Sequence, residues 1–147
     1  MFTGCSNSET NSTSRGLTDF AHIEEEYLAT IDSLNWPDGI TLPDKLEDED
    51  TGASFQVGYG ETRASYLWEY SWLWEYSWMK EWLDTYNTDP ERAEKALEEL
   101  EKAFDMPYMG IDRCDDATRN YLRENIDKAK LGDPSGFTES IRANYAN

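Results

Sequence analysis

The chain has 147 residues and a formal net charge of −18, with 31 acidic against 13 basic side chains. That length suits one domain, and an aromatic content of 14% argues against disorder, because disordered chains are poor in aromatic residues. So negative a chain repels phosphate groups and anionic lipid headgroups, which excludes nucleic acid and membrane binding through a basic face. The sequence has no apolar run of about 18 residues, so it predicts no transmembrane helix. Its two cysteines are too few for a disulfide framework.

The chain begins with a short motif, Phe2-Thr3-Gly4-Cys5, in which an apolar residue and two small residues precede a cysteine. This motif resembles the lipobox of bacterial lipoproteins, where the small residues admit the signal peptidase and the cysteine receives the lipid. The resemblance implies lipidation of Cys5 and a location outside the cytoplasm, with the lipid as the only membrane contact. We expect the gene to encode about 15–20 apolar and basic residues upstream of this motif.

A polar segment follows the motif. Residues 6–14 are nearly all Ser, Asn, Thr and Glu, a composition typical of a flexible tether. The alternative is an ordinary disordered terminus, in which an unlipidated Cys5 can pair with Cys114 in an oxidising compartment. We therefore predict a tether over residues 1–17 and a single helical domain over residues 18–147.

The first predicted helix covers about residues 19–35, with Thr18 as its N-cap and Pro37 beyond its end. Apolar residues at steps of three and four define its buried face. They are Phe20, Ile23, Tyr27, Ile31 and Leu34.

The segment over residues 37–60 is predicted to be mostly irregular. Two short strands, over residues 40–42 and 54–57, would form a β-hairpin within it. The acidic run between them, over residues 44–50, lacks the glycine and distal glutamate spacing of an EF-hand, so a calcium site is not the favoured interpretation.

A tryptophan-rich helix is predicted over about residues 62–86. Its apolar arc spans about 200°, whereas a surface helix buries a stripe of about 100°. We therefore expect this helix to be central, with the others packed around it. It contains five of the six tryptophans: Trp68, Trp72, Trp74, Trp78 and Trp82.

One acidic residue interrupts the tryptophan stripe, because helical spacing places Glu75 in its middle. A carboxylate buried there needs a partner or shifts its pKa upward. The structural interpretation is a glutamate satisfied by an arginine, a tyrosine hydroxyl or Ser71. The functional interpretation is a polar group at the base of an aromatic pocket. The candidate pocket residues are Glu75, Trp68, Trp72, Tyr76 and Trp82.

Three further helices are predicted in the last third of the chain. Asp-Pro pairs at 89–90 and 133–134 mark the starts of two of them, and the third covers about residues 116–131 before Gly132. The sequence thus predicts a mainly α fold of about five helices around the tryptophan-rich helix.

Two functions from different classes fit these features. The favoured one is a non-enzymatic, lipid-anchored domain of the cell envelope that binds a protein, peptide or glycan or serves as an accessory to a larger system. The alternative is a small hydrolase or carbohydrate-active domain in which Glu75 acts with Glu61 or Glu69, because paired carboxylates about 5–10 Å apart cleave glycosidic bonds. His22 is the sole histidine and no Cys/His cluster occurs, so no cofactor and no metal are expected.

Overall fold

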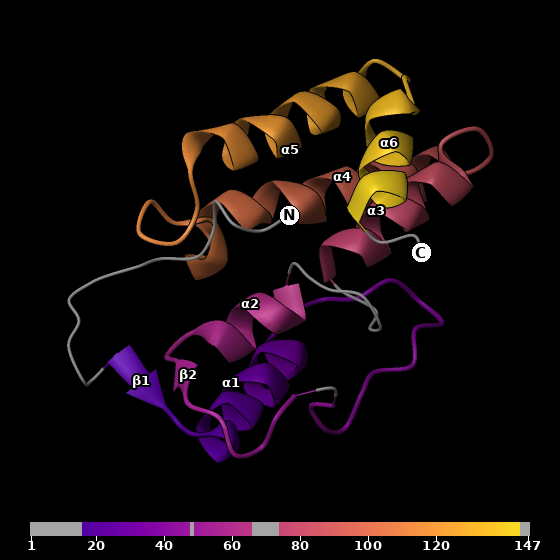
Figure 1. The fold of residues 1–147 in the computed structure, drawn as a ribbon. Helices are drawn as coiled ribbons and strands as arrows, with labels where there is room; N and C mark the ends of the chain where they lie inside the picture. Colours follow the sequence, from indigo (N-terminus) through magenta and orange to yellow (C-terminus); the bar gives the residue numbers. More distant parts are fainter. Residues whose placement is uncertain (1–15, 48, 66–73, 145–147) are drawn as a thin grey trace.

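The computed structural model describes residues 16–47, 49–65 and 74–144 of the chain (Figure 1). Within these ranges it contains six α-helices, two short 3-10 helices and one two-stranded sheet. The predicted mainly α fold is therefore confirmed. The lipobox-like motif and most of the predicted tether lie outside the described residues.

Helix α1 (Phe20–Ser33) begins one residue later than predicted, and its N-cap is Asp19 rather than Thr18. The Asp19 carboxylate accepts a 3.0 Å hydrogen bond from the backbone N–H of His22, which satisfies a donor at the helix start. Thr18 does not cap the helix because it belongs to strand β1 (Leu17–Thr18).

Strand β1 pairs antiparallel with β2 (Phe55–Gln56), so that Thr18 lies opposite Phe55. The strand predicted at 54–57 is therefore confirmed, but its partner precedes α1, and residues 40–42 are irregular. The pairing follows from tertiary packing. Each strand directly precedes one of two helices that pack together, α1 and α2 (Tyr59–Ser65).

The predicted tryptophan-rich helix corresponds to α2 and to α3 (Trp74–Thr85). Residues 66–73 between them lie outside the described residues, and so do Trp68 and Trp72. Most side chains of α3 are buried, including all three of its tryptophans.

The remaining predicted helices are confirmed with small shifts at their ends. Asp89 and Asp115 each accept a hydrogen bond from a backbone N–H three residues later, as N-caps do. The elements are α4 (Pro90–Glu101), η4 (Lys102–Asp105), η5 (Pro107–Met109), α5 (Asp116–Lys130) and α6 (Ser135–Asn144).

The buried apolar residues form two clusters. One is built mainly from α3, α4, α5 and α6, and the other from α1 and α2 with Leu46. In Figure 1 the first group of helices occupies the upper half of the molecule and α1, α2 and the small sheet the lower half. Trp36, just after α1, packs against both clusters and so links them.

Candidate functional site

The described part of the predicted aromatic pocket is packed core. Trp82 is 3% exposed, its ring stacks on Tyr86 with centroids 4.3 Å apart, and its edge-to-face contact with Phe137 spans 5.5 Å. Tyr76 is half-buried on the same helix. Trp82 therefore fills space between α3 and α6.

Glu75 is 3% exposed, so the burial that helical spacing predicted is confirmed. Its partner is a tyrosine, one of the three types expected: the Tyr108 hydroxyl donates a 2.5 Å hydrogen bond to Oε2 of Glu75. Burial raises the pKa of Glu75 to about 7, although the hydrogen bond from Tyr108 acts in the opposite direction. The carboxyl group is closed off from a soluble substrate.

Tyr108 also contacts Glu61, the residue considered as a second carboxylate for hydrolysis, through its backbone N–H. Tyr108 therefore contacts both carboxyl groups, Glu61 through its backbone N–H and Glu75 through its hydroxyl. Burial raises the pKa of Glu61, against the effects of the nearby Arg113 guanidinium and Ser65 hydroxyl. Glu69, the other candidate, lies outside the described residues.

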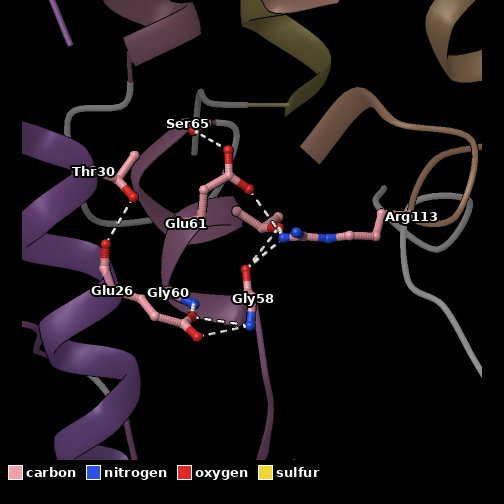
Figure 2. A network of polar contacts seen from close by, with 8 residues as sticks. Glu26, Thr30, Gly58, Gly60, Glu61, Ser65 and Arg113 are labelled. Atoms are coloured by element: carbon pink, nitrogen blue, oxygen red, sulfur yellow. Dashed lines mark hydrogen bonds and ion pairs between the residues drawn. The ribbon is translucent and has the colours of Figure 1, made fainter. Parts of the chain in front are cut away.

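Figure 2 shows that Glu61 belongs to a structural network around the start of α2. Arg113 Nη2 donates to Glu61 Oε1 at 3.0 Å and to the carbonyl oxygen of Gly58 at 2.5 Å. On the other side, the Glu26 carboxylate accepts hydrogen bonds from the backbone N–H groups of Gly58 and Gly60. These contacts fasten α2 to α1 and to the loop that carries Arg113.

Part of the acidic run serves a similar structural purpose. Glu49 Oε2 lies 2.9 Å from Nε of Arg63, a guanidinium that is 3% exposed, and accepts a 2.8 Å hydrogen bond from the Tyr59 hydroxyl. These two contacts of Glu49 hold α2 in place. No group of three metal-ligating side chains occurs among the described residues.

A surface pocket of about 260 Å³ opens elsewhere, between the segment after α1 and helices α3 and α4. We refer to it as the Trp36 pocket. Its lining includes Trp36 and Asp38 from the segment, Trp78 and Glu81 from α3, and Glu91 and Arg92 from α4.

The walls of the Trp36 pocket are held by hydrogen bonds of indole N–H groups to backbone oxygens. Trp74 and Trp78 both donate to the carbonyl oxygen of Asn35 at 2.9 Å, and Trp36 donates to the carbonyl oxygen of Ile31 at 2.9 Å. The segment after α1 is therefore fastened directly to α3.

Ion pairs fix the basic side chains of the pocket. Arg92 contacts Glu81 through Nε and Nη2, both at 2.8 Å. Lys95, which also lines the pocket, lies 2.9 Å from the buried carboxylate of Glu99. Both cations thus already have a carboxylate partner.

Sequence reasoning did not find this pocket. Trp36 stands alone after a predicted helix, and Arg92 and Glu91 occupy the ordinary polar face of another. A Trp-Pro pair at a helix end was the only local signal, and nothing in the sequence brings residues 36–38 beside residues 91–95.

Cys5, the predicted lipidation site, lies outside the described residues. Cys114 is buried beside Met109, which agrees with a small apolar core side chain. Among the described residues, no helix combines the length and apolar character needed to cross a bilayer. Comparison with known proteins finds no matching family model, no similar curated protein and no similar solved structure.

Proposed function

We propose that this chain is a non-enzymatic binding or accessory domain of the bacterial cell envelope, anchored through a lipid on Cys5. The burial of Glu75 is the observation that carries the non-enzymatic part. At 3% exposure, the carboxyl group on which the hydrolase alternative depends has no access to a bulky glycan or peptide.

The second carboxylate of that alternative is also engaged. Glu61 is bound by Arg113 and by the Ser65 hydroxyl, and burial raises the pKa of its carboxyl group. A glycosidase needs its two carboxyl groups on either side of one scissile bond. With Glu75 buried, a glycan cannot reach both carboxyl groups at once.

The Trp36 pocket supports the binding part of the proposal. Small ligands and side chains bind in concave sites with aromatic walls and a few fixed polar groups. Trp36 and Trp78 supply indole surface here, and Asp38, Glu81, Glu91 and Arg92 supply charged groups. Hydrogen bonds to Asn35 hold the walls without a ligand, which reduces the ordering that binding requires.

The anchoring part rests on the resemblance of Phe2-Thr3-Gly4-Cys5 to a lipobox and on the polar tether behind it. It is tested by expressing the full gene in bacteria that are fed an alkyne-tagged fatty acid. The wild-type protein should carry the tag and partition into detergent, and Cys5→Ser should do neither. Cys114→Ala is the matched control and should be tagged like the wild type, and an untagged wild type would refute the anchor.

The non-enzymatic part is tested with purified envelope glycans and peptides as substrates. The wild type and Glu75→Gln should both release no product above background. Release by the wild type that Glu75→Gln abolishes would establish the hydrolase alternative.

A further inference from the structure

We propose that the Trp36 pocket binds a basic side chain, a guanidinium or ammonium group carried by a positively charged segment of a partner protein. This inference rests on the proposed binding function and names the chemistry of its ligand.

The size of the pocket favours one side chain over a larger ligand. Its volume of about 260 Å³ lies below the roughly 300–1,000 Å³ that is typical of sites for drug-sized molecules. A single arginine or lysine inserted from a peptide matches such a space, whereas an oligosaccharide would extend far beyond it.

The charges around the pocket favour a cation. Arg92 is paired with Glu81, and Lys95 is paired with Glu99, which also binds Lys102. Asp38 and Glu91 are exposed and line the same pocket. Asp38 adds to the electrostatic effect of Glu81 on Arg92, without a direct ion pair among the described residues. The lining has three acidic residues, Asp38, Glu81 and Glu91, against two basic ones, so its net charge is negative.

The aromatic surface points to the same ligand. The indole N–H groups of Trp36 and Trp78 are both occupied by backbone carbonyl oxygens. What remains for a ligand is ring surface, supplied mainly by the half-buried Trp36, because Trp78 is only 3% exposed. Tryptophan is the aromatic residue that attracts a cation most strongly.

The whole chain supports this choice at longer range. A net charge of −18 produces a field that attracts a positively charged segment and speeds its association, more so at low salt. The Trp36 pocket then binds one basic side chain of that segment.

The test compares two capped pentapeptides, acetyl-Gly-Gly-Arg-Gly-Gly-amide and the same peptide with citrulline in place of arginine. Citrulline keeps the shape of arginine and lacks its charge. Isothermal titration at low salt should give a dissociation constant below about 1 mM for the arginine peptide and a value at least about tenfold higher for the citrulline peptide. Raising the salt concentration should weaken the binding of the arginine peptide but not that of the citrulline peptide.

Two double variants locate the binding. Asp38→Asn with Glu91→Gln removes the two exposed pocket acids and should weaken binding of the arginine peptide about tenfold. Asp127→Asn with Glu124→Gln removes the same charge from exposed positions on α5, outside the pocket lining, and should change the constant by less than about twofold. Circular dichroism should show that both variants fold.

Each other outcome has a definite meaning. Equal binding of the citrulline peptide, or equal weakening by both double variants, would overturn the basic side chain as the pocket ligand. A dissociation constant above about 1 mM for the arginine peptide would do the same. The fatty acid labelling of Cys5 tests the proposed lipid anchor independently of these results.

Discussion

The hydroxyl of Tyr108 donates a 2.5 Å hydrogen bond to the carboxylate of Glu75, and both side chains are almost completely buried. Tyr108 lies in η5 and Glu75 in the first turn of α3, so this contact joins two residues that are 33 positions apart in the chain. The Glu75 carboxyl group therefore lies at the larger apolar cluster, and its described hydrogen-bond donor, the Tyr108 hydroxyl, carries no charge.

The first prediction concerns the pH dependence of folding. Burial raises the pKa of Glu75 to about 7 in the folded state from the ordinary 4.5, so the folded state binds this proton more tightly than the unfolded chain. The Glu75 contribution therefore favours folding at low pH and is lost as the pH rises from 4.5 to 7, by up to roughly 3 kcal/mol. Urea unfolding at pH 5 and pH 8 measures this loss.

Glu75→Gln should remove this loss of stability with rising pH. The neutral amide still accepts a hydrogen bond from the Tyr108 hydroxyl and has no charge to desolvate. The variant should match the wild type at pH 5 within about 1 kcal/mol and exceed its stability at pH 8. Glu94→Gln, at an exposed position of α4, should keep the wild-type pH dependence. A Glu75→Gln variant less stable than wild type at pH 8 would mean that Glu75 neutralises a buried cation.

The second prediction isolates the tyrosine hydroxyl. Tyr108→Phe should cost about 1–3 kcal/mol at pH 8, where it leaves an ionised and buried carboxylate without its donor. The cost should be smaller at pH 5, where Glu75 is protonated. Tyr121→Phe, at an exposed tyrosine of α5, should stay within about 0.5 kcal/mol of wild type at both pH values. Equal costs at the two pH values would contradict the proposed role of the hydroxyl.

The third prediction concerns the contact of α1 with α2. A Cβ atom on Gly60 would lie 2.1 Å from the carbonyl oxygen of Ile23 and 2.7 Å from Cβ of Glu26. Gly60→Ala must therefore separate the two helices and weaken the Glu26 network, and it should cost more than about 2 kcal/mol in the free energy of unfolding. Gly16→Ala meets no atom within 4 Å and should be nearly neutral, so similar urea midpoints for both variants would rule out the close helix contact.

The fourth prediction concerns Trp82, which is 3% exposed between α3 and α6. Trp82→Ala should cost about 3–5 kcal/mol, because it leaves a cavity beside Phe137. The native tryptophan emission should be blue-shifted relative to the unfolded chain. Emission at the unfolded wavelength, or a change in stability below about 1 kcal/mol, would place Trp82 at the surface.

Local features of the sequence determined most of the helical elements. Helical spacing placed Ile23, Tyr27 and Ile31 inward on α1, and the same spacing correctly buried Glu75 on α3. The Asp-Pro pairs at 89–90 and 133–134 marked the starts of α4 and α6. These features were readable because periodicity and capping depend on residues within about four positions of one another.

The tertiary structure alone decided which distant residues meet. Tertiary packing makes Tyr108 the partner of Glu75 and pairs Phe55 with Thr18 instead of with residues 40–42. It also forms a surface pocket at Trp36, whereas the described part of the predicted aromatic pocket is packed core. The reason is physical: a helix face specifies that a side chain is buried, but the group it then contacts depends on how separate elements pack. No single stretch of this sequence specifies that packing, because the Trp36 pocket forms only where the segment after α1 lies against α3 and α4.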